Sequence, residues 1–462
     1  MNNALKITWF LFLAVLPVNL TFFLGLERFL PADFLLPVLF AFAAPLVFHR
    51  FAGVVRRDWP VFVYLGIFLL VAGLAALRSG IDNSLLIAAA AQGMLAALYL
   101  IFRCTVFEKK IFIRLMGLWV GVSSVVCLVG LGAVALGYLG LETPLARWYP
   151  EMGPGAWRLI GLTGHSPNMA YGYLHVGFFI ALGLWLRQRQ GNRDVNSDAS
   201  PGWWQRTLLP ATVLHGLALA ATFSRGLPGL LLGMIIVTHV LLPGKSGKRY
   251  IGVKISLWAA LLVMFAYGTV FFTYTTDALF TSSRAAADSL RLKKSEAHQR
   301  FYSYKNVLHL KNGASYRSFE RIGFTYLPSM HAYLMQASLH FFIENPLAGV
   351  GPGRFPGRLE SLRDEGKLGL PPGLPHLRPH STVMGALAEG GLPGFAGLFL
   401  VWWFFLGPRS WRRLRGDRLG LCLYASVAGY LLFALNVDVM NFRWLWLLFA
   451  FESSWREMAE DE

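Results

Sequence analysis

The feature that most constrains this chain is a series of apolar segments, most of them roughly 18 residues long or more. About 20 residues of α-helix rise about 30 Å, which is the thickness of the hydrocarbon core of a membrane. The segments therefore predict an all-α polytopic membrane protein. About twelve spanning helices are expected, near 5–25, 35–53, 59–77, 84–103, 111–139, 168–186, 207–223, 227–243, 251–274, 382–406, 419–436 and 441–454.

The composition agrees with a membrane protein. The 462 residues are 55% hydrophobic and 15% charged, whereas about 25% of a soluble domain is charged. The first segment resembles a signal sequence but lacks a small-x-small cleavage site, so we expect a retained helix. Three cysteines without a CxxC pair predict neither a disulfide framework nor a metal site.

The basic residues predict the orientation of the helices. Clusters of Lys and Arg follow the second, fourth, sixth, eighth and tenth segments, for example Arg56 and Arg57 after the second and Arg412 and Arg413 after the tenth. By the positive-inside rule, both termini are then cytoplasmic. Topology also accounts for the bulk of the formal net charge of +17, so no nucleic-acid partner is inferred.

Two long segments fall on the outer side in this topology, at 141–167 and 275–381. The second has helix-like stretches at 315–324 and 329–346, broken by Gly and Pro, and is expected to form an ordered and mostly helical subdomain. The chain thus divides into helices 1–9 within 1–274, an outer subdomain at 275–381, and helices 10–12 with a cytoplasmic tail at 382–462.

His380 is the strongest candidate for chemistry. It lies on the outer side at the start of the tenth helix, where Ser381 is a suitable N-cap. The electropositive helix N-terminus disfavours imidazolium, so a neutral ring could accept a proton near pH 7. The alternative is a capping or interfacial histidine.

Glu389 lies nine positions after His380. In one unbroken helix this spacing puts the two residues about 13.5 Å and half a turn apart, so their side chains cannot touch. A carboxyl at this depth should face the protein interior. We interpret Glu389 as a packing or supporting residue.

Arg225 lies in a tight outer turn, "FSRG", between two apolar segments. A planar guanidinium recognises phosphate well, although a snorkelling arginine is the alternative. Arg147, Arg158 and Arg321 are among further cations on the outer side. A basic outer cavity beside the membrane suits an anionic lipid head group such as a polyphosphate, and a solvated basic face is the alternative.

Several familiar site motifs are missing. The stretch "NPLAGVGPGRF", 345–355, lacks the lysine and the strand-turn-helix context of a P-loop. No HExxH, GxSxG or outer DxD sequence is present. We therefore expect neither a cofactor nor a metal.

Four stretches together resemble the bacterial O-antigen ligases and their relatives, the O-antigen polymerases and protein O-oligosaccharyltransferases. The first runs from Arg158 through Gly164 and Pro167 to Asn168, and the second is Ser224-Arg225-Gly226. The third is "ENPLAGVGPGRF", and the fourth is "HSTVMGALAEGGLPG", which begins at His380. The four occur in the family's order and cover mainly 155–230 and 330–395.

The resemblance implies a fold like that of GT-C glycosyltransferases and a transfer without metal in the bacterial inner membrane, at a site facing the periplasm. The donor is a glycan on undecaprenyl pyrophosphate, and the acceptor is a sugar hydroxyl of lipid A-core. His380 is the implied general base of an inverting reaction. Arg225, with Arg158 and other outer arginines such as Arg147 and Arg321, would hold the pyrophosphate. Ser224, Asn168, Glu389 and His331 are supporting candidates.

The chain departs from the family at one important position. Relatives carry an Arg-x₃-Trp before the Asn-Pro-Leu stretch, where this chain has His331 and Met335. An arginine of the large outer segment, such as Arg321, would have to substitute. A polymerase or a protein glycosyltransferase shares the same chemistry and remains an alternative, as does a transporter of lipid-linked glycans.

Overall fold

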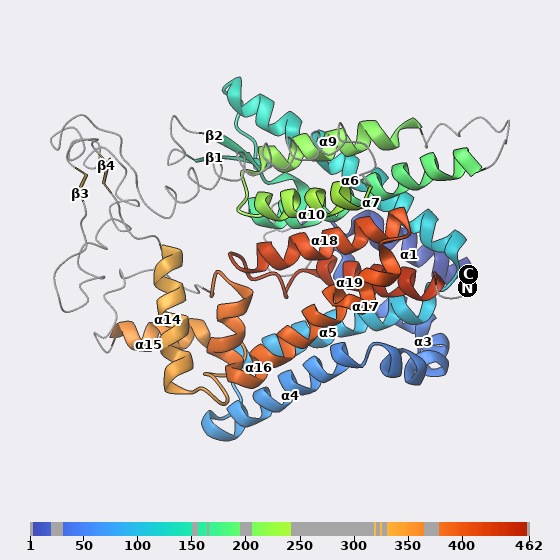
Figure 1. Ribbon diagram of the computed structural model, residues 1–462. Coiled ribbons are helices and arrows are strands. Elements are labelled where there is room, and N and C mark those ends of the chain that lie inside the picture. Colours follow the sequence, from blue (N-terminus) through green and yellow to red (C-terminus); the bar gives the residue numbers. More distant parts are fainter. Residues whose placement is uncertain are drawn as a thin grey trace.

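The computed structural model describes residues 3–19, 31–149, 156–163, 166–194, 206–241, 318–319, 324–325, 330–364 and 378–459. This part is a bundle of helices with two small β-ribbons (Figure 1). The helices of its first half are α1 (Asn3–Val15), α3 (Pro31–Arg57), α4 (Trp59–Ser79), α5 (Asn83–Thr105), α6 (Lys109–Tyr138), α7 (Pro167–Asp194), α9 (Leu208–Ala221) and α10 (Leu227–Leu241). The second half contains α14 (Met330–Glu344), α15 (Phe355–Asp364), α16 (Thr382–Leu406), α17 (Pro408–Leu414), α18 (Arg418–Ala434) and α19 (Arg443–Met458).

Six helices of the described part are long and apolar enough to cross a membrane, so the protein is a helical membrane protein. They occupy Pro31–Arg57, Trp59–Ser79, Asn83–Thr105, Lys109–Tyr138, Pro167–Arg189 and Thr382–Leu414. Helices α1, α9, α10 and α18 are apolar but shorter. The 17 residues of α18, for example, rise only about 26 Å.

The expectation of twelve spans is thus met only in part. Eleven of the expected segments coincide with a helix, and the remaining one, 251–274, lies outside the described residues. However, within the described residues five of the eleven helices are shorter than a full crossing requires, including the 16-residue α19. Apolar composition locates the helices, but it does not by itself give the number of full crossings.

Helix α7 forms the centre of the bundle. Of the residues in its apolar stretch, 83% are buried, and it packs against α6, α9, α18 and α19. Several of its aromatic residues are fully enclosed, and Tyr173 stacks on Trp119 of α6. This packing places the N-terminus of α7 beside the turn between α9 and α10.

The basic clusters gather at one end of the bundle, where α1 begins and α19 ends; we call it the termini end (Figure 1). Arg57 pairs with Glu457 of α19. Lys109 and Arg187 both lie over the ring of Trp455. The structure therefore brings clusters from separate helices to the same end, as the positive-inside pattern predicts.

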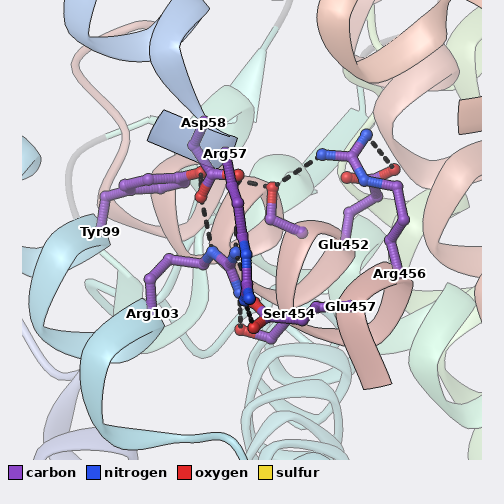
Figure 2. A network of polar contacts seen from close by, with 9 residues as sticks. Arg57, Asp58, Tyr99, Arg103, Glu452, Ser454, Arg456 and Glu457 are labelled. Atoms are coloured by element: carbon purple, nitrogen blue, oxygen red, sulfur yellow. Dashed lines mark hydrogen bonds and ion pairs between the residues drawn. The ribbon is translucent and has the colours of Figure 1, made fainter. Parts of the chain in front are cut away.

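A buried network of ions fastens this end (Figure 2). Arg103 of α5 donates to Asp58 through Nε at 2.6 Å and to Glu457 through Nη2 at 2.9 Å. Tyr99 also donates to Asp58, at 2.7 Å. Asp58 is 1% exposed and Arg103 4%, so their ion pair joins the α3–α4 turn to α5 away from water. The partly exposed Glu457 extends the network to α19.

Replacing Arg103 with methionine should therefore be strongly destabilising. It leaves the buried carboxylate of Asp58 without its cation, which costs about 3–5 kcal/mol. Thermal unfolding in detergent measures the loss, and the double variant with Asp58→Asn should recover part of it. Equal stability of Arg103→Met and the wild type would contradict the assignment.

At the opposite end, strands β1 (Ala146–Tyr149) and β2 (Ala156–Leu159) pair antiparallel, and the short 3₁₀ turn η1 (Gly161–Thr163) follows them. We call this the ribbon end. Trp157 packs with Ala133 of α6, which anchors the ribbon on that helix. The sequence predicts only a loop here, because four residues are too few to show the alternation of apolar and polar side chains that identifies a strand.

The second ribbon corrects one expectation within 275–381. Strands β3 (Ser318–Phe319) and β4 (Phe324–Thr325) pair where a helix over 315–324 is expected. Aromatic and hydroxyl residues at the paired positions favour strands over helix. The other expected helix, within 329–346, is confirmed as α14.

Candidate functional site

The turn between α9 and α10 is a tightly bonded unit at the ribbon end. Phe223 adopts the left-handed backbone region with φ 45°. Ser224 is fully buried, and its Oγ accepts from the amide of Gly226 at 3.2 Å. The same Oγ donates to Oδ1 of Asn168 on α7 at 2.7 Å. These contacts fix the backbone on both sides of Arg225.

Arg158 of β2 braces this turn from the other side. Its Nε donates to the carbonyl of Thr222 at 2.9 Å, and its Nη2 donates to the carbonyl of Phe223 at 2.8 Å. The residue is 6% exposed. The sequence analysis assigns Arg158 to the pyrophosphate, but two of its donors are committed to the backbone. The geometry instead makes Arg158 a positioning residue for Arg225.

Arg147 of β1 lies directly opposite Arg158 in the ribbon and is exposed. Side chains opposite each other in an antiparallel pair project to the same face. Arg147 is therefore brought to the site by strand pairing, although 78 positions separate it from Arg225. Three of the four predicted phosphate-binding arginines thus lie in the turn or in the ribbon that braces it.

His380 comes from a distant part of the chain and completes this group. It precedes Ser381, whose Oγ accepts from the amide of Met384 at 3.3 Å. The predicted N-cap of α16 is thus confirmed. Burial and, to a smaller extent, the nearby positive charge of Arg225 together lower the pKa of His380 to about 4. The ring is therefore neutral at pH 7.

The physical reason for this neutrality differs from the one expected from the sequence. The sequence predicts that the electropositive N-terminus of α16 keeps the ring neutral. In the structure, burial is the larger cause of the lowered pKa of His380, and the positive charge of Arg225 is the smaller cause. The ring remains partly exposed to solvent. A neutral, accessible imidazole beside a guanidinium is suited to taking a proton from a group bound next to an anion.

In the structure, Glu389 binds backbone amides of the glycine-rich stretch 345–355. Its two carboxylate oxygens accept from the amides of Gly353 at 3.0 Å and Phe355 at 3.2 Å. These amides lie at the N-terminus of α15, where a carboxylate is favourable. Glu389 thus binds the glycine-rich loop to α16.

The same loop pairs with the backbone of α16 at a kink. Val350 donates to the carbonyl of Ala388 at 2.9 Å, and Leu392 donates to that of Pro346 at 2.7 Å. Gly391 adopts φ 60° at the kink, and a Cβ there would lie 2.6 Å from the Pro346 oxygen. Two of the four stretches that carry the resemblance therefore form one packed unit.

Replacing Gly391 with alanine should break this unit. The left-handed backbone and the overlap with Pro346 together cost more than about 2 kcal/mol. The expected result is a lower unfolding temperature and faster proteolysis at 345–355. Gly390, where an added Cβ meets nothing within 4 Å, is the matched control, and an equal effect of Gly390→Ala would contradict the explanation.

Two predicted site residues fall wholly or partly outside this description. Arg321 lies outside the described residues. The backbone of His331 lies in α14, but the description does not extend to its side chain. Within the described ranges, no group of three or more His, Cys, Asp or Glu side chains is arranged to hold a metal ion.

The structure also reveals a cavity of about 640 Å³ that the sequence analysis does not predict. It lies between α4, α5, α15, α16 and the loop before α19. Gln92, Glu389 and Asp438 line it, as do Arg378, Pro379 and Thr382, which flank His380. The one signal in the sequence is the amide of Gln92 within an apolar span, since polar groups at such depth are costly.

These features define a helical membrane protein with a group of arginines and a neutral histidine at one end. Comparison of the chain with family models and with curated proteins found no match in either set.

Proposed function

We propose that the protein is a glycosyltransferase of the O-antigen ligase type, with a GT-C-like fold in the bacterial inner membrane. Its donor is a glycan on undecaprenyl pyrophosphate, and its acceptor is a sugar hydroxyl of lipid A-core. The observation that carries the proposal is the approach of the neutral His380 to Arg225. These residues lie 155 positions apart, so their proximity is a product of folding.

In the proposed reaction, His380 takes the proton of the acceptor hydroxyl as its oxygen attacks the anomeric carbon. The bond from that carbon to the pyrophosphate oxygen breaks, and undecaprenyl pyrophosphate leaves with both bonding electrons. Arg225 stabilises the departing negative charge. A single displacement inverts the anomeric centre, and solvent removes the proton from His380 afterwards.

The surroundings of Arg225 support this assignment of roles. Arg158 holds the backbone of the turn, and Ser224 binds Asn168, so the guanidinium is presented from a rigid base. Arg147, which is exposed, adds a cation on the ribbon opposite Arg158. Preorganised charges are most effective at a leaving group because they need no reorganisation during the reaction.

The site also lies at the ribbon end, opposite the basic clusters. If the termini end is cytoplasmic, as the positive-inside rule proposes, then His380 and Arg225 face the periplasm. This is the side on which the lipid-linked donor and lipid A-core meet in the ligase reaction. A cytoplasmic location of residue 380 in an accessibility experiment would contradict the orientation.

The pH dependence of transfer tests the role of His380. A base with a pKa of about 4 is unprotonated throughout the range from pH 8 to pH 5. The rate should therefore stay level over that range and fall only near pH 4, whereas an ordinary histidine would lose activity below about 6.5. The measurement is the transfer rate of purified protein, with each sample returned to pH 7 to exclude denaturation. A midpoint near 6.5 would contradict the prediction.

Complementation of a Gram-negative strain that lacks its own ligase tests the function. Expression of the wild-type chain should restore a lipopolysaccharide ladder on a gel. Elongation of single-repeat caps without ligation would instead favour a polymerase. Absence of both, with the protein present in the membrane, would overturn the proposal.

A further inference from the structure

The cavity of about 640 Å³ has two chemically different regions. Its size is typical of a ligand site. One region is formed by apolar side chains of the spanning helices: Ile67, Phe68 and Val71 of α4, Ile87 and Ala91 of α5, and Leu398 of α16. The other region carries polar groups: Asn83, Gln92, Glu360, Glu389, Asp438 and Asn441. A cavity with this division suits an amphiphile, whose alkyl part would contact the apolar region and whose head group would contact the polar region.

Gln92 offers a buried hydrogen-bond acceptor at the wall of the cavity. The residue is only 6% exposed, and its Oε1 has no hydrogen-bond partner among the described residues. A buried acceptor without a partner is costly, so such a group is usually satisfied by a ligand or by water. The neighbouring acids are already engaged, because Glu389 accepts two amides and Asp438 accepts from Asn441 at 2.6 Å.

The groups around the cavity disfavour a diphosphate. Three carboxyl groups line it, from Glu360, Glu389 and Asp438, against the single cation Arg378 among its lining residues. The buried acceptor left for a ligand is the amide oxygen of Gln92, which favours a group with hydroxyl donors. The cavity thus differs in chemistry from the arginine group around Arg225.

We propose that this cavity binds an amphiphile with an uncharged sugar head group, with its alkyl part against the apolar side chains of α4 and α5 and its sugar beside Gln92. This preference rests on the cavity alone and does not depend on the proposed function.

Protection of an introduced cysteine tests the binding. The three native cysteines are buried, so Ser84→Cys at the rim of the cavity can be labelled selectively with a maleimide in nanodiscs. The probe is dodecyl maltoside below its micellar concentration, and dodecyl phosphate is the anionic counterpart. Leu86→Cys is the matched control, because Leu86 is 54% exposed on the same helix and does not line the cavity.

We expect dodecyl maltoside at ten times its Kd to slow labelling of Ser84→Cys about tenfold, with no change for Leu86→Cys. Dodecyl phosphate should protect far less. Filling the cavity with Ala91→Phe, or removing the acceptor with Gln92→Leu, should abolish or weaken protection in chains that elute as the wild type does. No protection, equal protection by both probes, or protection that survives both variants would overturn the inference.

The labelling experiment and the complementation experiment can fail independently of each other. Protection without any lipopolysaccharide ladder would retain the sugar site and reject the ligase. A ladder without protection would retain the ligase and reject the sugar site in this cavity.

Discussion

Replacing His380 with alanine is expected to lower the rate of glycan transfer by about 10²–10⁴-fold, because the acceptor hydroxyl loses its general base. Binding of the donor should stay within a few-fold of the wild type, since His380 is assigned to the acceptor proton. The measurements are single-turnover transfer and donor binding on the same purified protein. This separation of rate from affinity distinguishes a base from a residue that only shapes the site.

His239→Ala is the matched control for this variant. His239 is an exposed histidine near the end of α10 and lies far along the helix from the Arg225 turn. Its replacement should leave both rate and affinity unchanged. Transfer by His380→Ala at the wild-type rate would remove the general-base assignment.

Replacing Arg225 with methionine is expected to lower transfer by about 10²–10³-fold, because the departing pyrophosphate loses a preorganised cation. Donor binding should weaken as well, unlike in His380→Ala. Arg225→Lys should restore only part of the activity, since an ammonium lacks the planar pair of donors that fits phosphate. Arg206→Met, at an exposed position before α9, is the control.

Arg225→Met should also change the pH dependence of transfer, which a general loss of structure would not do. Arg225 lowers the pKa of His380, so its removal should raise that pKa and move the acid limb of the residual activity to higher pH. Burial, the larger cause, remains, and the shift is therefore only partial. An unchanged acid limb would contradict the proximity of the two groups.

The sequence predicts the local features of this molecule well. Length and hydropathy locate the helices because a spanning helix satisfies its own backbone and needs no distant partner. The N-cap at Ser381 follows from residue type at a helix start, and the structure confirms it. The grouping of basic clusters at one end is likewise predictable, since it follows from alternation along the chain.

Features that depend on distant contacts could not be predicted in the same way. The two carbonyls that bind Arg158 belong to residues more than 60 positions away, so its bracing role is visible only after folding. The pairing of the loop at 345–355 with the kink at Gly391 also joins separate segments. For the same reason, nothing in the local sequence places Gln92 at the wall of a cavity.

The most direct test of the central claim uses purified protein, a synthetic undecaprenyl-pyrophosphate-linked glycan and lipid A-core in the presence of EDTA. We expect the wild type to form a glycan–core product of inverted anomeric configuration and to release undecaprenyl pyrophosphate, whereas His380→Ala should do both at least about 100-fold more slowly. Failure of the folded wild type to transfer, or undiminished transfer by His380→Ala, would contradict the central claim.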